Sequence, residues 1–273
     1  MAGRTVLVTG STSGIGFETA RRLAAMGAHV VLAVRDPERG EAVASEIARA
    51  GGSAEVLPID LASFASVRRA AERFSASQAA LDVLINNAAI AVAKRELSVD
   101  GHELTWETNF LSAFLLTRLL LPALKRAARP RVVNVGSDAH RVGRIDWENL
   151  ELSKGFGGYR AYANSKLALL LFTKELARRE ARICSNVLHP GAIATNIWRA
   201  VPGPFRWVIR AVLPSPGRGA APVVRLASDP GLDGVTGRYF SRFREATPSW
   251  AGLHEADAAR LWDVAASAAG LAP

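Results

Sequence analysis

The most informative segment of the chain is Thr9-Gly10-Ser11-Thr12-Ser13-Gly14-Ile15-Gly16, which follows a β-branched run at residues 5–8. A helical pattern begins inside this segment and continues to residue 26. Gly10 permits a tight turn, Gly14 lets the backbone approach a pyrophosphate, and Gly16 lets the helix pack on the strand. The free N–H groups at the start of the helix attract phosphate. The segment is therefore predicted to bind the phosphates of a dinucleotide.

Short β-branched runs alternate with longer stretches of helical period through most of the chain. The expected strands are 5–8, 29–34, 54–59, 81–85, 130–135 and 183–188, and the expected helices are 14–26, 37–50, 63–75, 105–128 and 159–179. The strands read as nearly continuous Val, Ile and Leu, which is typical of strands buried on both faces. The pattern predicts an α/β fold with three layers, in which helices cover a doubly wound parallel sheet of about seven strands.

The 273 residues are expected to form a single domain, because no linker rich in Pro, Gly or Ser interrupts the alternation before residue 190. With 49% hydrophobic residues the chain has enough apolar material for a substantial core, which excludes a disordered chain. Residues 198–216 are rich in Pro, Trp and Arg and break the alternation. Such segments are often lids or binding loops, so 190–216 is expected to form the substrate-binding loop and helix. The alternative is a surface segment that packs against a partner subunit.

The chain carries 34 Lys and Arg residues against 25 Asp and Glu residues, a net charge of +9. Most of the basic residues are Arg scattered over amphipathic patterns, so we expect no nucleic-acid partner. The single Cys184 cannot form an internal disulfide, and the first residues lack the pattern of a signal peptide. No apolar segment is long enough to span a bilayer. We therefore expect a cytoplasmic protein, with membrane-surface contact through residues 198–213 as the less favoured alternative.

Arg35 directly follows the second expected strand, where a dinucleotide-binding sheet meets the adenosine ribose. An acidic side chain there accepts from the ribose 2′-hydroxyl of NAD, whereas an Arg accommodates the 2′-phosphate of NADP. Arg35, with Arg39 one helical turn further on, therefore predicts NADP(H). Asp36 fits either the ribose or the cap of a helix that begins at Pro37. A surface Arg without a ligand is the alternative for Arg35.

Tyr162 and Lys166 lie four residues apart in an expected helix, so they share one face. A phenol titrates too high to shuttle protons at neutral pH, and a nearby ammonium favours the phenolate. Ser137 follows the expected strand 130–135 at the carboxyl end, where doubly wound sheets bind their ligands. The three residues together predict an acid–base site.

With these motifs the chain resembles the short-chain dehydrogenase/reductase family over nearly its full length. The matching motifs are TGxxxGxG at 9–16, Asp60-Leu61, Asn86-Asn87-Ala88-Ala89, Asn109 within 108–110, Ser137, YxxxK at 162–166, and Pro190-Gly191 followed by Thr195. Stretches 35–39, 136–140, 165–168 and 189–191 are similar to the retinol dehydrogenase-like and carbonyl reductase-like branch. Ala89 stands where the family usually has Gly, and Gly136 is a milder departure, but neither removes a catalytic group.

The resemblance implies a Rossmann fold and an enzyme that interconverts a carbonyl and an alcohol by hydride transfer. Tyr162 is then the general acid/base, Lys166 lowers its pKa and holds the nicotinamide ribose, and Ser137 binds the carbonyl oxygen. Asn109 anchors a water that leads from Lys166 to solvent. Residues and resemblance together give these expected cofactor contacts: Gly10, Ser11, Thr12, Ser13, Gly14, Ile15, Gly16, Arg35, Arg39, Asp60, Leu61, Asn87, Ala88, Tyr162, Lys166, Pro190, Gly191, Ile193 and Thr195. No metal is expected.

The expected substrate is a small apolar carbonyl or alcohol, because the irregular segment is rich in large apolar residues. These residues are Trp198, Phe205, Trp207, Val208 and Ile209. Two alternatives stay open: reduction of a C=C bond, as in protochlorophyllide reductase-like relatives, and a non-catalytic sensor or scaffold that binds NADP(H). The helices 105–128 and 159–179 resemble the pair through which many family members form a homodimer or homotetramer.

Overall fold

The computed structural model describes residues 1–193 and 215–272, and its described part contains one sheet of eight strands. The strands are β1 (Thr5–Thr9), β2 (His29–Val34), β3 (Ser53–Pro58), β4 (Val83–Asn86), β5 (Arg131–Val135), β6 (Cys184–His189), β7 (Tyr239–Ser241) and β8 (Arg244–Glu245). Their order is β3-β2-β1-β4-β5-β6-β7-β8. All neighbours pair in parallel except β7 and β8, which are antiparallel. The doubly wound parallel sheet is confirmed, with a strand number close to that expected.

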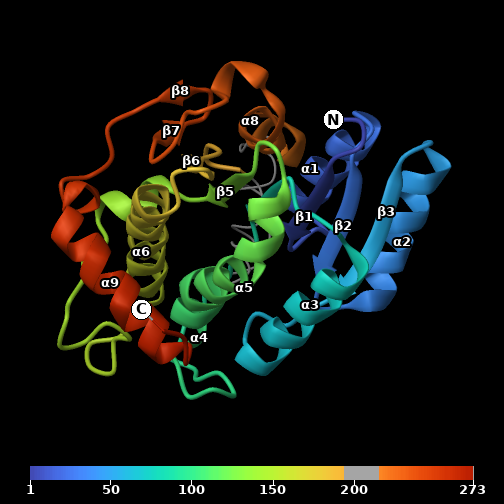
Figure 1. Ribbon diagram of the computed structural model, residues 1–273. Helices are drawn as coiled ribbons and strands as arrows, with labels where there is room; N and C mark the ends of the chain where they lie inside the picture. The colour runs from blue at the N-terminus through green and yellow to red at the C-terminus, as the bar shows by residue number, and fades with distance from the viewer. Residues whose placement is uncertain (194–214, 273) are drawn as a thin grey trace.

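Helices cover both faces of the sheet (Figure 1). They are α1 (Gly14–Ala25), α2 (Pro37–Arg49), α3 (Phe64–Ser77), α4 (Leu104–Trp106), α5 (Ser112–Arg126), α6 (Gly158–Arg179), α8 (Pro216–Ser228) and α9 (Glu255–Ala268), with short helical turns η1 (Glu107–Leu111), η2 (Asp138–Arg141), η4 (Pro230–Leu232) and η5 (Ala251–Leu253). Side chains along β1 alternate between two hydrophobic clusters. Val6 and Val8 join the cluster of α1, α2 and α8, whereas Leu7 joins that of α3, α5, α6 and α9. This alternation produces the three layers.

Helix α2 begins where its sequence predicts. The Asp36 carboxylate accepts the N–H of Arg39 at 3.2 Å, and Pro37 occupies the first turn. Of the two roles open to Asp36, the structure shows the helix cap. Ser63 caps α3 in the same way and accepts from the N–H of Ser66 at 3.3 Å.

The expected continuous helix 105–128 is interrupted in the structure. It consists of α4, the π-helical turn η1 and α5, which ends at Arg126. A single π turn widens the winding locally but leaves the apolar face almost unchanged, so the hydrophobic period does not reveal it. Asn109 lies within this turn. The elements β7, β8, α8 and α9 follow residue 190, beyond the regular alternation, and the sequence pattern did not predict them individually.

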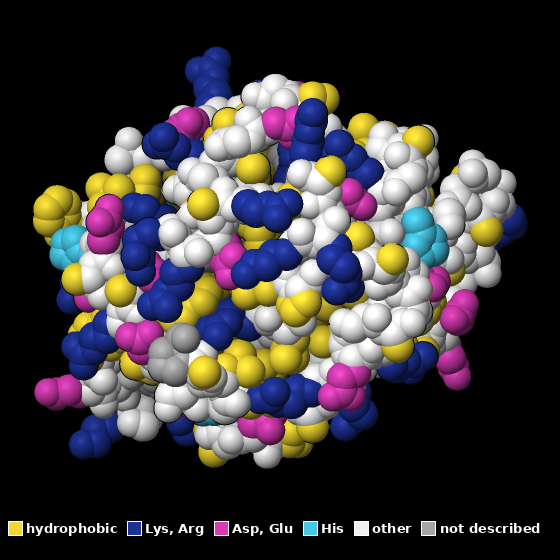
Figure 2. Space-filling view, in the orientation of Figure 1, with side chains coloured by type: hydrophobic (Ala, Val, Ile, Leu, Met, Phe, Trp, Pro, Cys, Tyr) yellow, Lys and Arg dark blue, Asp and Glu magenta, His cyan; other side chains and the backbone are white. Residues whose placement is uncertain are grey.

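Residues 194–214 lie outside the described residues. They hold Thr195 and most of the expected substrate-binding segment 190–216, so the expectations for that segment stay predictions. Within 1–193 and 215–272, no helix combines the length and the apolar character needed to cross a membrane. Figure 2 shows Lys and Arg side chains spread over the visible face among apolar and acidic ones. This agrees with the scattered basic residues of the sequence.

Buried polar side chains link the central strands to the helices that cover them. The Asn86 amide donates to Thr117 Oγ1 at 3.1 Å and to Asn134 Oδ1 at 2.8 Å. The Asn134 amide in turn donates to Thr173 Oγ1 at 2.8 Å. This chain of bonds joins β4 and β5 to α5 and α6, so the two helices are held in register with the strand ends.

We predict that Asn134→Val lowers the free energy of unfolding by about 1–3 kcal/mol, because the buried Asn86 amide and the Thr173 hydroxyl each lose one hydrogen bond. Urea denaturation of the two proteins checks this value. A change below about 0.5 kcal/mol would show that the polar chain contributes little.

Candidate active site

The glycine turn after β1 has the backbone geometry that its residues predict. Gly10 and Gly14 have φ values of +67° and +60°, which favour glycine. A Cβ on Gly16 would lie 2.3 Å from the Gly10 carbonyl oxygen and 2.5 Å from Asn87 Nδ2. Helix α1 therefore approaches β1 and β4 so closely that only glycine fits at residue 16.

Thr9 and Asn87 hold the glycine turn against the loop after β4. Thr9 Oγ1 accepts the backbone N–H groups of Asn87 and Ala88, both at 3.0 Å. The Asn87 side-chain amide donates to the Thr9 carbonyl at 2.8 Å and to the Gly10 carbonyl at 3.3 Å. Asn87 and Ala88, expected to line the cofactor ribose, thus also fix the shape of the turn.

The turn fits a pyrophosphate. The first turn of α1 contains no acidic residue, so its positive end is not neutralised locally. Ser11 is fully buried, and its hydroxyl has no hydrogen-bond partner among the described residues. Thr12 and Ser13 complete the turn before the helix, and Ile15 is buried at its start. A buried hydroxyl that lacks a hydrogen-bond partner and lies beside a helix N-terminus can donate to a phosphate oxygen.

Arg35 and Arg39 differ in whether their guanidinium groups are already paired with a carboxylate. Arg39 Nε forms an ion pair with Asp36 at 3.2 Å, although its side chain is 72% exposed. Arg35 is exposed and makes no ion pair or side-chain hydrogen bond with a described residue. Arg35 is therefore the available guanidinium at the end of β2.

Asp60 and Leu61 follow β3 at the same edge of the sheet. Asp60 Oδ1 accepts the N–H of Ala62 at 3.0 Å, while the Asp60 N–H donates to Ser66 Oγ at 2.9 Å. The Leu61 carbonyl accepts from Ser112 Oγ at 2.6 Å. These bonds fix the segment between α3 and α5, at the part of the edge where the adenosine is expected.

Helix α6 brings Tyr162 and Lys166 to the end of β5, next to Ser137. Lys166 is 2% exposed, and its ammonium donates to the Val135 carbonyl at 2.9 Å. It lies 5.6 Å from the centroid of the Tyr162 ring. The Ser137 hydroxyl lies close enough to the Tyr162 phenol to lower its pKa. The three residues predicted to form an acid–base site are therefore brought together.

The Asn109 side chain connects this group to the loop after β4. Its Oδ1 accepts the N–H of Ile90 at 2.8 Å, and its amide donates to the Ile90 carbonyl at 2.9 Å and to Ser165 Oγ at 3.0 Å. Ser165 Oγ donates to the Tyr162 carbonyl at 2.8 Å. The side chain of Asn109 thus has a positioning role, and its expected part in binding a water stays a prediction.

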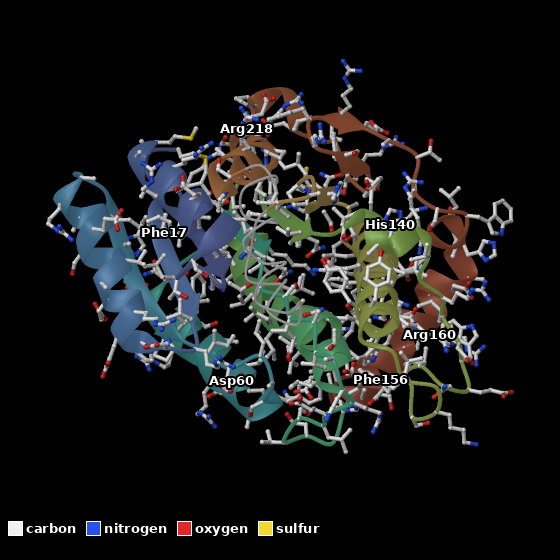
Figure 3. The ribbon with its side chains drawn as sticks, turned by 180° about the vertical axis from the view of Figure 1, so that it is seen from behind. Phe17, Asp60, His140, Phe156, Arg160 and Arg218 are labelled. Carbon is white, nitrogen blue, oxygen red and sulfur yellow. The ribbon has the colours of Figure 1, made fainter. Side chains whose placement is uncertain are left out.

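The loop after β6 forms the remaining described side of the site. Gly191 has a φ of +102°, and a Cβ there would lie 3.4 Å from Arg242 Nε. Pro190 precedes it, and Ile193 is buried against Gly219 of α8. Figure 3 shows residues from several elements at this edge, with Phe17 and Asp60 on one side and His140 and Arg160 on the other.

Comparison with known proteins identifies the family. The family model of the short chain dehydrogenases matches residues 4–203. The chain belongs to this family. It is 40% identical to human retinol dehydrogenase 11 over 277 residues, which covers 99% of this chain and 87% of that protein. It is 42% identical to mouse polyprenol dehydrogenase over 278 residues, with coverages of 95% and 82%.

A solved structure gives a further comparison. The Pseudomonas aeruginosa protein RhlG, in an NADP active-site complex, is 30% identical, with a TM-score of 0.72 and coverages of 93% of this chain and 98% of that one. The retinol dehydrogenase-like branch inferred from the motifs is confirmed, and the protein is an oxidoreductase with a nucleotide-binding Rossmann fold.

Burial controls the titration of the two groups on α6 of this dehydrogenase. It raises the pKa of the Tyr162 phenol to about 12, and the hydrogen bond with Ser137 works against that rise. Complete burial lowers the pKa of the Lys166 ammonium to about 7. The shift of Tyr162 is opposite to the expected one, because desolvation of the phenolate is the largest contribution to it. At pH 7 Tyr162 is a protonated phenol beside a lysine that exchanges protons readily.

Some residues at this edge were not predicted as site residues. Asp138 accepts from the Tyr239 hydroxyl at 2.7 Å and lies 3.4 Å from His189 Nε2. His140 is buried, with Nδ1 2.7 Å from the Ser137 carbonyl, and its Nε2 accepts the N–H of Ser249 at 3.2 Å. The sequence does mark these residues, because Asp138, His140 and His189 lie in stretches 136–140 and 189–191, which are similar to the retinol dehydrogenase-like and carbonyl reductase-like branch.

A buried carboxyl group also lies in η1, two residues before Asn109. The Glu107 side chain is fully buried, and burial raises its pKa from 4.5 to about 7, with the negative charge of Asp100 adding to the rise. No motif marked Glu107, since a single acidic residue in an apolar stretch carries no sequence signature.

We predict that Glu107→Gln removes a pH dependence of stability. The folded pKa lies above the unfolded one, so the wild type loses stability as the pH rises from 4.5 to about 7. Relative to the variant, its free energy of unfolding should fall by about 2–3 kcal/mol between about pH 5 and about pH 8. Urea unfolding of both proteins at the two pH values measures the difference. A difference that stays constant with pH would contradict the assignment.

Proposed function

We propose that the protein is an NADP(H)-dependent oxidoreductase that interconverts a carbonyl and an alcohol on a small apolar substrate. The carrying observation is the convergence of Ser137, Tyr162 and Lys166 beside a glycine turn that fits a pyrophosphate. The Ser137 hydroxyl can donate a hydrogen bond to the substrate oxygen, and the Tyr162 hydroxyl can donate a proton to it. The buried Lys166 ammonium can then help to reprotonate Tyr162.

In reduction, the Ser137 hydroxyl donates to the substrate carbonyl oxygen and polarises it. A nicotinamide dinucleotide held by the glycine turn and by Asn87 and Ala88 would supply hydride to the carbonyl carbon. The Tyr162 phenol gives its proton to the same oxygen, which completes the alcohol, and the resulting phenolate is stabilised by the Lys166 ammonium. Since the pKa of Lys166 lies at about 7, this residue can lose and regain a proton near neutral pH and so help to reprotonate Tyr162.

The choice of NADP(H) rests on Arg35. Its guanidinium has no ion-pair partner among the described residues and follows β2, where the 2′-phosphate is expected. The NADP complex of RhlG supports a nicotinamide dinucleotide cofactor. The Asp36 carboxylate is engaged by Arg39 and the start of α2, so it competes little for the ribose.

The apolar substrate is supported by the relatives named for retinol and polyprenol, which are both apolar alcohols. The large apolar residues of 198–209 add to this from the sequence. The cytoplasmic location and the assembly into a homodimer or homotetramer stay predictions.

We predict that Tyr162→Phe lowers the rate of NADPH oxidation with apolar aldehydes by about 100-fold or more. The dissociation constant for NADPH should change by less than about threefold, because the phosphate and ribose contacts remain. Tyr159→Phe is the matched control, since Tyr159 lies on the same helix but is 67% exposed. Turnover that survives in Tyr162→Phe would overturn the mechanism, and a wild type that binds NADPH without turning over would favour the sensor or scaffold.

We predict that Arg35→Ser weakens NADPH binding by about tenfold or more and leaves NADH binding unchanged, because only NADPH carries the 2′-phosphate. Isothermal titration with both cofactors measures this. Arg69→Ser is a suitable control, because Arg69 is an exposed arginine on α3. Equal losses for the two cofactors, or tighter binding of NADH by the wild type, would show that Arg35 does not select NADP(H).

A further inference from the structure

A cavity of about 490 Å³ lies between α6, β6 and the chain from β7 to η5. Its floor is a small hydrophobic cluster of Leu170, Val187 and Tyr239, with Ala246 packed against it. This cluster is separate from the two that cover the faces of the sheet. Among the described residues, none of those expected to bind the cofactor lines the cavity. Figure 1 shows the segment from β8 to α9 running past α6.

Two cations, Lys174 and Arg238, and one carboxylate, Glu245, line this cavity. The Lys174 ammonium is half-buried and donates to the Gly252 carbonyl at 3.3 Å, but it has no carboxylate partner among the described residues. Arg238 lies 3.4 Å from Glu245, and both side chains are more than half exposed, so water competes for this pair. An apolar floor with an ammonium at its wall matches an anion that carries an apolar body.

Both sides of the cavity are bonded to η2, the turn that follows Ser137. From the floor, the Tyr239 hydroxyl donates to Asp138 at 2.7 Å. From the outer wall, the Thr247 carbonyl accepts from Arg141 at 3.0 Å. The neighbouring Ser249 N–H donates to His140, whose other ring nitrogen contacts the Ser137 carbonyl. A molecule that separates the wall from the floor must therefore act on η2.

We propose that this cavity binds a small amphipathic carboxylate and that its occupancy lowers turnover by displacing Ser137. The carboxylate meets Lys174, with Arg238 as second cation, and the alkyl chain covers Leu170 and Val187. The proposed binding of a carboxylate does not depend on the proposed function, whereas the proposed effect on turnover rests on it. A free phosphate suits the cavity less well, because its charge would lie on an apolar floor.

Isothermal titration with octanoate, at saturating NADPH, tests the binding. Octanoate should bind with one-to-one stoichiometry, and Lys174→Gln should weaken it by about tenfold, because the charged donor is lost. Arg238→Gln should weaken it by a smaller factor, whereas Lys154→Gln, an exposed lysine outside the cavity, should not change it. Octanol, which has the same chain without the charge, should bind more weakly than octanoate. Undetectable octanoate binding, or equal binding by the wild type and Lys174→Gln, overturns the proposal.

Steady-state kinetics test the coupling to Ser137. Saturating octanoate should lower kcat by about twofold or more, which a competitor for the substrate site would not do, since it raises KM alone. Tyr239→Phe should keep octanoate binding and lose most of this effect, because the link to Asp138 is gone. An unchanged kcat in the presence of bound octanoate overturns the coupling. An inactive protein that still binds octanoate through Lys174 would instead contradict the proposed function and leave the binding site standing.

Discussion

The site depends on one buried charge, the ammonium of Lys166, which donates to the Val135 carbonyl at the end of β5. Removing an ammonium from water is costly, and the structure compensates with few polar contacts, so its pKa falls to about 7. This is possible only because α6 lies tightly on the sheet, with Leu167 buried next to the lysine and Leu170 buried one turn after it. The same packing buries Tyr162 and brings it to Ser137. Proton exchange near neutral pH is therefore a consequence of how closely one helix covers one strand end.

The rest of the edge is arranged to hold that helix and the cofactor turn in one geometry. Thr9 and Asn87 tie the glycine turn to the loop after β4, and Asn109 ties that loop to α6 through Ser165. Each of these side chains bonds to backbone atoms of another element, so a shift of one loop disturbs all the others. The motifs of the short chain dehydrogenases thus include positioning residues as well as groups that touch substrate.

Much of the fold and of the site could be predicted from the sequence, because these features depend on residues that are close together in the chain. Buried parallel strands, the Asp36 cap and the glycine turn follow from periodicity and from backbone sterics. The π turn at Asn109 could not be predicted, because one widened turn keeps the apolar face. The bond from Tyr239 to Asp138 joins residues 101 positions apart, and the raised pKa of Glu107 depends on tertiary burial. Such features arise only when distant elements pack together.

In the proposed reaction, hydride passes from NADPH to a carbonyl carbon at the Ser137–Tyr162–Lys166 group. The most direct test uses NADPH deuterated at the reactive carbon of the nicotinamide ring, and farnesal, an apolar aldehyde whose carbonyl is conjugated to a C=C bond. Mass spectrometry and NMR of the product locate the label. We expect farnesol with deuterium on the alcohol carbon. Deuterium on the former C=C bond of a saturated aldehyde, or no transfer to any apolar carbonyl, would contradict it.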